Sequence, residues 1–191
     1  MINADVVVVG GSAAGIPAAV TAKRHHPQKR VMLIRREEQV LIPCGIPYIF
    51  GTVGSTDNNL IPDAVLEKNN ILLLINEVET IDRKAKTIKV LSGEQVGYDK
   101  LVLATGSQPF IPPIKGVEKE NVFAVWKDVD YLNGFKKCLS SGVKNLVVVG
   151  GGFIGVEFAD ECARRKNLSV TIIEMLPHCL QLAYDDEVCE R

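Results

Sequence analysis

The sequence predicts an α/β chain with two Rossmann-like dinucleotide-binding domains, each built on a parallel sheet. Two observations predict this class. Residues 6–15 and 146–155 each read as an apolar strand, a glycine-rich turn and the start of an apolar helix. A further apolar strand follows each helix, at 31–34 and 170–173, which completes a strand–helix–strand unit in both copies. In this layout the N-terminal amides of the helix face a pyrophosphate.

The two copies match at the glycine turn and differ after the second strand. The matching turn positions are Gly10, Ser12 and Gly15 in the first copy, and Gly150, Gly152 and Gly155 in the second. The residue after the second strand should meet the adenine ribose of a dinucleotide. It is Arg35 in the first copy and Glu174 in the second. The second copy therefore carries the complete pattern, whereas the first lacks the middle glycine and the acid.

The hydrophobic pattern predicts the elements in chain order. The first are a strand over 5–9, a helix over about 13–25, a strand over 31–34, a turn and helix over 43–50, a short helix over 62–69 and a buried strand over 71–75. Short alternating strands over 78–96 then predict an antiparallel excursion on the parallel sheet, before a strand over 101–104 returns to it. A proline-rich crossover over 109–120 and a helix over 128–140 lead into the second repeat.

These elements divide the chain into three parts. We expect a first nucleotide-binding domain over 1–110, a crossover and linker helix over 111–144, and the start of a second nucleotide-binding domain over 145–191. The second repeat has a strand, a helix and a strand, and a dinucleotide domain needs more strands than that. The chain is therefore interpreted as a fragment of a longer protein or as an abbreviated version of one.

Composition argues against several classes of protein. The 191 residues are 47% apolar and carry a formal net charge of −1, so they show no electrostatic footprint for nucleic acid or an anionic membrane. No apolar run is long enough to span a membrane and there is no room for a signal peptide, so a cytoplasmic protein is expected. The five cysteines include no Cys-x-x-Cys pair, which predicts neither a disulfide framework nor a metal site.

Cys44 is the candidate catalytic residue. It follows the second strand of the first repeat, near the carboxyl edge of the predicted sheet, where a cofactor lies. The next residues begin a predicted helix, and a thiol at a helix N-terminus has its thiolate stabilised by free amides and the helix dipole. The alternative is a buried structural cysteine.

Residues 10–15, 44–48, 98–107 and 150–157 form four motifs. Their order resembles that of the FAD-dependent pyridine nucleotide–disulfide oxidoreductases. The single-cysteine branch of that family is the most similar, namely the coenzyme A disulfide reductases, persulfide reductases, and NADH oxidases and peroxidases. The resemblance covers essentially the whole chain. It implies FAD and NADH as cofactors, and a homodimer formed through a carboxyl-terminal domain that this sequence lacks.

The resemblance also assigns roles to individual residues. FAD would be held by Gly10, Ser12, Ala13, Ala14 and Gly15, with further contacts from Arg35, Pro43, Val78, Thr105 and Gly106. NADH would be held by Gly150, Gly152, Phe153, Ile154, Gly155, Glu157 and Glu174. Phe153 matches an aromatic residue that screens the flavin, and the charge of Glu174 would repel the 2′-phosphate of NADPH. Cys44 matches the redox cysteine, and Arg24 matches a basic position that contacts coenzyme A.

The sequence departs from the family pattern at two positions. Arg35 stands where the family usually has an acid for the FAD ribose. This leaves open whether Glu37 or Glu38 takes that role, or whether Arg35 lies over the adenine. Val40 stands where coenzyme A disulfide reductases usually have a serine, so Arg24 is the one residue that favours coenzyme A.

Several functions remain open. The leading expectation is electron transfer from NADH through FAD to a small-molecule disulfide or persulfide, with coenzyme A among the candidates, by way of Cys44. The first alternative is an NADH oxidase or peroxidase in which Cys44 cycles through a sulfenic acid. The second is an NADH-dependent reductase that feeds an electron-transfer protein, which needs no cysteine near the flavin. A non-catalytic nucleotide-binding module is disfavoured by the complete second repeat and by the placed thiol.

Overall fold

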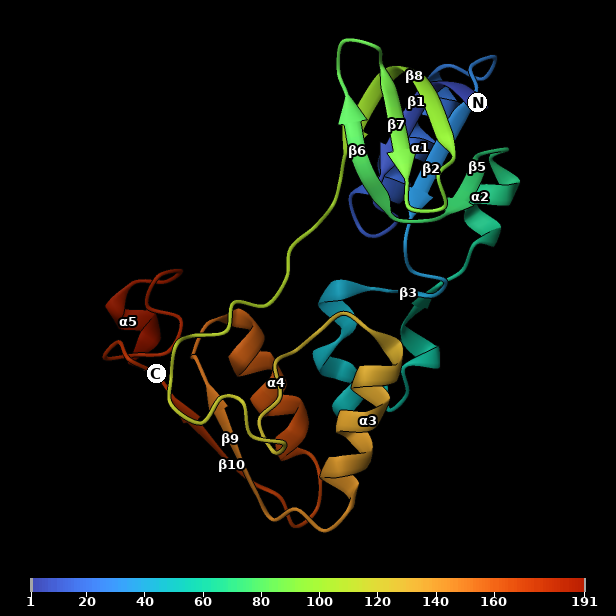
Figure 1. Ribbon diagram of the computed structural model, residues 1–191. Helices are drawn as coiled ribbons and strands as arrows, with labels where there is room; N and C mark the ends of the chain where they lie inside the picture. Colours follow the sequence, from blue (N-terminus) through green and yellow to red (C-terminus); the bar gives the residue numbers. More distant parts are fainter. Residues whose placement is uncertain (1, 191) are drawn as a thin grey trace. The chain divides into compact units, whose positions relative to one another are not determined.

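A computed structural model of the protein describes residues 2–190, which form two compact units (Figure 1). The first unit contains the residues up to 43 together with 60–110, and the second contains 44–59 together with the residues from 111 onward. Each unit holds one of the two repeats, and the predicted α/β class is confirmed. None of the helices within 2–190 is long and apolar enough to cross a membrane.

A six-stranded sheet in the order β5-β2-β1-β8-β7-β6 forms the centre of the first unit. Four of its strands run parallel: β1 (Ile2–Val9), β2 (Val31–Arg35), β5 (Leu72–Ile75) and β8 (Gln95–Leu103). Two antiparallel strands extend it, β6 (Val78–Asp82) and β7 (Thr87–Val90). The carboxyl ends of the parallel strands meet at one edge of the sheet, and the first glycine turn follows β1 at that edge.

Apolar side chains cover both faces of this sheet. One face packs against α1 (Gly15–His25) and α2 (Ala64–Lys68) in a core of Val8, Ile16, Ala19, Val31, Leu33, Leu66 and Ile71. The other face shares a core with the antiparallel strands, made of Ala4, Val7, Val9, Met32, Ile34, Ile88, Val90 and Val96. Because β1 and β2 are buried on both faces, they read as continuous apolar runs in the sequence.

Two strands of the first unit differ from the prediction. The last strand of the antiparallel excursion and the strand that returns to the parallel sheet are one continuous strand, β8, which pairs with both β1 and β7. β5 was expected to be buried, but it is an edge strand of the sheet. Its Leu72 and Ile75 are consequently 44% and 43% exposed.

A short ladder of β3 (Val40–Leu41) with β4 (Leu60–Ile61) joins the points where the chain leaves and re-enters this unit.

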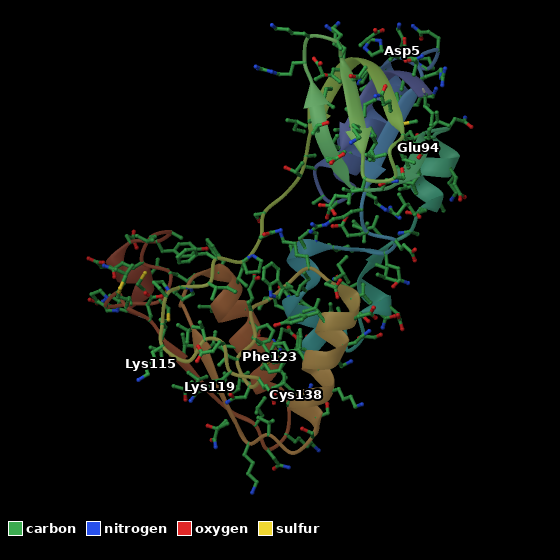
Figure 2. The ribbon with its side chains drawn as sticks, viewed as in Figure 1. Asp5, Glu94, Lys115, Lys119, Phe123 and Cys138 are labelled. Carbon is green, nitrogen blue, oxygen red and sulfur yellow. The ribbon has the colours of Figure 1, made fainter. Side chains whose placement is uncertain are left out.

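The second unit contains the parallel pair β9 (Asn145–Val149) and β10 (Ser169–Ile173). Its helices are α3 (Val129–Ser140), α4 (Phe153–Ala163) and the short α5 (Asp186–Cys189). An aromatic cluster fills its core. Phe123, labelled in Figure 2, stacks on Phe135 with ring centroids 4.3 Å apart, and Phe50 lies 5.0 Å from Phe135 and 4.7 Å from Phe158. The segment 44–59 is therefore part of this core, and Trp126, the one tryptophan of the chain, lies in the same unit.

The predicted helix over 43–50 is not an α-helix. The structure has two short 3-10 turns there, η1 (Pro43–Gly45) and η2 (Pro47–Phe50). The hydrogen bonds of η2 span three residues, from the amide of Ile49 to the carbonyl of Ile46 at 3.2 Å and from Gly51 to Tyr48 at 3.2 Å. Pro47 has no N–H to donate to the carbonyl of Pro43, four residues before it, so η1 and η2 cannot join into one α-helix.

Candidate dinucleotide sites and cysteine segment

The first glycine turn brings the end of β1 against the start of α1. The amide of Gly10 donates to the carbonyl of Ile34 at 2.8 Å. Gly10 has a φ of 109°, a conformation that favours glycine. A Cβ atom on Gly15 would collide with the carbonyl oxygen of Gly10. Glycine is therefore required at both ends of the turn for the helix to begin this close to the strand.

The second glycine turn repeats this geometry in the other unit. The amide of Gly150 donates to the carbonyl of Ile173 at 2.8 Å, and the φ of Gly150 is 107°. A Cβ atom on Gly155 would collide with the carbonyl oxygen of Gly150. At Gly152, in contrast, an added Cβ would meet nothing within 4 Å, so this side of the turn is open.

The helices that begin at these turns lack side-chain caps. Neither α1 nor α4 has a capping hydrogen bond from a side chain, and neither has an acidic residue in its first turn. In contrast, α3 is capped by Asp128 and α5 by Asp185. Uncapped N-terminal amides next to a glycine turn form a binding site for phosphate. Both turns therefore fit the pyrophosphate of a dinucleotide.

The carboxylate of Glu174 lies against the second turn. It accepts hydrogen bonds from the amide of Leu176 at 2.9 Å and from the amide of Gly151 at 2.5 Å. These backbone hydrogen bonds, first that of Leu176 and then that of Gly151, lower the pKa of Glu174. The carboxylate is therefore charged at neutral pH. Since each carboxylate oxygen can accept more than one hydrogen bond, capacity remains for the hydroxyls of a ribose.

Arg35 occupies the matching place at the first turn. Its side chain is 1% exposed, and its aliphatic part packs against Gly11. Its guanidinium forms a bidentate ion pair with Asp63, at 2.6 and 2.8 Å. It also donates to the carbonyls of Glu37 at 2.7 Å and Glu38 at 2.8 Å. The charge of Arg35 is thus engaged inside the first unit.

Cys44 is an exposed free thiol in η1. The 3-10 turn that follows it packs against α4, the helix behind the second glycine turn. The segment after Cys44 forms 3-10 turns in place of the expected α-helix, so the Cys44 thiolate does not have the dipole of a full α-helix to stabilise it. The exposure of the thiol nevertheless leaves it open to a substrate.

The other predicted residues of the first unit are scattered. Thr105 and Gly106 are exposed in the loop after β8. The hydroxyl of Ser12 donates to the carbonyl of Leu41 at 3.4 Å. Arg24 is exposed in the last turn of α1, so almost the whole helix separates it from the glycine turn. The remaining predicted FAD positions are exposed at Ala13 and Ala14 and half-buried at Pro43, which begins η1, and at Val78.

At the second turn, the predicted aromatic residue is exposed. Phe153 is 52% exposed and meets Tyr184 edge-on, with ring centroids 5.9 Å apart. Ile154 is 65% exposed, and Glu157 is half-buried one turn further along α4. Phe153 and Ile154 therefore stand at the open side of the turn.

Three residues near these sites were not found by the sequence analysis. Asp63 pairs with Arg35, the sulfur of Cys179 lies against Gly151, and the buried carboxylate of Glu161 binds Thr52. Asp63 lies in the first turn of the helix predicted over 62–69, but nothing in that pattern links it to Arg35. The other two depend on contacts between segments that are distant along the chain, and no local pattern indicates them.

A sequence profile of the pyridine nucleotide-disulphide oxidoreductases matches residues 4–191. The chain belongs to this family. The resemblance inferred from the four motifs is thereby confirmed, and the two glycine turns are the parts of the structure expected from a member that handles pyridine nucleotides.

Individual members of the family show the same likeness. A protein of Methanocaldococcus jannaschii named NADH oxidase is 33% identical over 193 residues, which cover 96% of this chain and 43% of that protein. A Pyrococcus horikoshii protein named NAD(P)H coenzyme A polysulfide/persulfide reductase is 35% identical over 191 residues, 97% of this chain and 42% of that protein. The solved structure of a NAD-dependent persulfide reductase from A. fulgidus has a TM-score of 0.87 and 32% identity, covering 99% of this chain and 37% of that chain. The chain thus spans less than half the length of these relatives.

Proposed function

We propose that this protein is an NADH-dependent flavoprotein oxidoreductase that delivers electrons to a sulfur acceptor through Cys44. The observation that carries the proposal is the pair of glycine turns with the same geometry and uncapped helices, one in each unit. Two dinucleotide sites in one chain suit an enzyme that passes electrons from one dinucleotide to another. The exposed thiol of Cys44 supplies the group that can react with sulfur.

The residues of each turn fit the cofactor assigned to it. In the first unit, the turn from Gly10 to Gly15 would hold FAD. In the second, the turn from Gly150 to Gly155 would hold NADH, with Glu174 on the adenine ribose. The charge of Glu174 disfavours the 2′-phosphate of NADPH. When bound, the flavin would relay an electron pair from the nicotinamide to the sulfur attached to Cys44.

The chemistry of Cys44 follows from its exposure. Its thiolate attacks one sulfur of a disulfide or persulfide, forms a new S–S bond to that sulfur, and expels the other sulfur as a thiol or hydrogen sulfide once it takes up a proton. Two electrons and a proton then break this bond, release the bound sulfur as a thiol or, after attack on the outer sulfur of a persulfide, as hydrogen sulfide, and restore the Cys44 thiolate. The substrate proposed is a small-molecule persulfide or disulfide, with coenzyme A as a candidate carrier because two relatives are persulfide reductases. A cytoplasmic homodimer is part of the same proposal.

A second candidate is an NADH oxidase or peroxidase. It is favoured by the 33% identical relative named NADH oxidase. In that reaction the thiolate of Cys44 takes one oxygen atom from hydrogen peroxide and, with uptake of a proton, becomes a sulfenic acid while water leaves. Two electrons and two protons then return it to the thiol, with loss of a second water.

The test is the Cys44→Ser variant of the holoprotein, with Cys138→Ser as the matched control. We expect Cys44→Ser to leave bleaching of the flavin absorbance by NADH largely intact, and to lower turnover with coenzyme A disulfide or a coenzyme A persulfide by orders of magnitude. Turnover with hydrogen peroxide, measured in parallel, decides between the two candidates. Full disulfide and persulfide turnover in Cys44→Ser would contradict a role for this thiol and favour a reductase that feeds an electron-transfer protein.

A further inference from the structure

The two units are built alike up to the residue that should meet the adenine ribose. Ile34 and Ile173 accept the same hydrogen bond from the first glycine of the turn, each at 2.8 Å. The next residues are Arg35 and Glu174, and each lies against the second residue of its turn. The first unit therefore presents an arginine where the second presents a carboxylate.

Arg35 is poorly placed to bind a ligand by its charge. A guanidinium has five N–H groups, and at least four of those of Arg35 donate to Asp63 and to the carbonyls of Glu37 and Glu38. Its side chain is also 1% exposed. A 2′-phosphate, which an arginine at this place would otherwise suit, therefore finds no free cation there.

Asp63 is the carboxylate that the Arg35 side chain holds. Its side chain is 37% exposed, so the group is open to solvent on one side. Asp63 precedes α2, yet it makes no capping hydrogen bond to that helix, unlike Asp128 at α3 and Asp185 at α5. Its carboxylate turns to Arg35 instead of to its own helix.

Asp63 lies outside the strands, at the carboxyl edge of the six-stranded sheet. β5 pairs in parallel with β2, with Arg35 opposite Ile75. The chain must therefore return from the carboxyl edge of the sheet through α2 before β5 begins, so the residue before α2 lies at the carboxyl edge. In doubly wound sheets dinucleotides bind at that edge.

We propose that Asp63, oriented by Arg35, is the ribose-binding carboxylate of the first dinucleotide site. Each oxygen of Asp63 accepts one N–H of Arg35 and retains a further lone pair. The two remaining acceptors suit the 2′- and 3′-hydroxyls of an adenosine ribose. The inference rests on the proposed assignment of FAD to this unit. It assigns to Asp63 the ribose contact that an acidic residue at position 35 would otherwise make.

The Arg35–Asp63 pair is neutral overall, whereas Glu174 in the second unit carries a negative charge that no ion pair within residues 2–190 compensates. This difference in charge suits the different ligands proposed for the two sites. NADH and NADPH differ by a 2′-phosphate, so a lone charged acid in the second unit can discriminate between them. A flavin dinucleotide carries no such phosphate, so the first unit has none to exclude. A neutral Arg35–Asp63 pair can bind the diol without that discrimination.

The experiment compares FAD with the analogue that lacks the 2′-hydroxyl of its adenosine ribose. Each is titrated against the full 191-residue chain by flavin fluorescence, with excess NAD⁺ present to occupy the second site. The analogue loses one hydrogen bond to a charged group, so we expect it to bind the unmodified chain roughly 10- to 100-fold more weakly than FAD. Asp63→Asn should weaken the binding of FAD by a larger factor than the binding of the analogue, because FAD has two hydroxyl contacts to this carboxylate and the analogue has one. Glu67→Gln, which removes a carboxylate from α2 itself, should change neither.

Three results would overturn the inference. Equal binding of FAD and its analogue by the unmodified chain would do so without any variant, and would leave the assignment of FAD to this unit intact. If Asp63→Asn weakens both ligands by the same factor, the ion pair only stabilises the fold. If FAD shows no saturable binding at all, the proposed cofactor assignment fails, and the role of Asp63 fails with it.

Discussion

The buried carboxylate of Glu161 accepts two hydrogen bonds from Thr52. The backbone amide of Thr52 donates at 2.5 Å and its hydroxyl at 2.9 Å, and Glu161 is 3% exposed. The neighbouring Gly51 permits this approach, because a Cβ atom there would collide with the carbonyl of Glu161. The pair fastens the segment that follows Cys44 to α4.

Loss of this carboxylate should destabilise the second unit. In Glu161→Gln the amide group cannot accept both hydrogen bonds, and a buried unsatisfied donor costs about 1–3 kcal/mol. We expect the free energy of unfolding in urea to fall by about 2 kcal/mol. Asp160→Asn is the control, since the side chain of Asp160 is 64% exposed in a surface ion pair, and such pairs contribute at most about 1 kcal/mol. An equal effect of the two variants would contradict a special role for Glu161.

Alanine should be tolerated less well at Gly10 than at Gly150. Both glycines have φ near 110°, where a Cβ atom costs roughly 1–2 kcal/mol. At Gly10 the added Cβ would also collide with the carbonyl of Ala104, whereas at Gly150 it would meet nothing within 4 Å. Urea unfolding of Gly10→Ala should therefore show clearly the larger loss of stability. Equal losses of unfolding free energy in Gly10→Ala and Gly150→Ala would contradict this prediction and would mean that the backbone around Ala104 can shift to make room for the added Cβ atom.

Glu174 should control the choice between NADH and NADPH. Glu174→Ala removes both the acceptor for the ribose hydroxyls and the charge that opposes a 2′-phosphate. We expect NADH to bind roughly 10-fold more weakly, since a hydrogen bond to a charged group contributes about 1.5–3 kcal/mol, while NADPH binds no worse. Nucleotide fluorescence titrations measure both affinities, and Glu190→Gln provides a control in the same unit. A native protein that prefers NADPH would refute the assignment.

Cys44 should react with alkylating reagents much faster than Cys162. Cys44 is exposed, whereas Cys162 is 0% exposed and burial raises its pKa to about 11. At neutral pH Cys162 is therefore protonated as well as inaccessible. Mass spectrometry after brief iodoacetamide treatment should find the label on Cys44 first, and the difference should disappear in denaturant. Comparable rates in the folded protein would show that the segment around Cys162 opens readily.

The buried thiol of Cys162 should also make stability depend on alkaline pH. Its pKa is raised from 9.0 to about 11 in the folded state, so its contribution is complete below pH 9. As the pH rises towards 11, the unfolded chain ionises before the folded one, and up to roughly 3 kcal/mol is lost. The stability difference between the native protein and Cys162→Ala should shrink over this range. A constant difference would contradict the shift.

The sequence was sufficient for the parts of the fold that repeat a local pattern. Both strand–helix–strand units, the two glycine turns and α3 lie close to the predicted positions, because apolar periodicity and glycine placement determine them locally. The merging of two predicted strands into β8 was missed. The amino-terminal part of β8 pairs with β7 as well as with β1, and no feature of its own residues shows that both pairings belong to one continuous strand.

The candidate sites were predictable only where the chemistry is local. Glu174 follows its strand directly, so its place at the second turn could be read from the spacing. Arg35 stood out as a departure, but its partner Asp63 is 28 residues away along the chain, and no spacing rule connects them. The 3-10 turns around Cys44 were read as a helix, because proline is compatible with the first turn of either.

The single tryptophan makes the two units separately observable. Because Trp126 belongs to the second unit, its emission reports on that unit alone, whereas circular dichroism averages over both. If the two signals change at different urea concentrations, the chain does not unfold in one cooperative transition, and each variant discussed above must be assigned to its own transition. A bound reduced nicotinamide in the same unit would also accept excitation from Trp126, so the residue offers a direct optical probe of the second site without any added label.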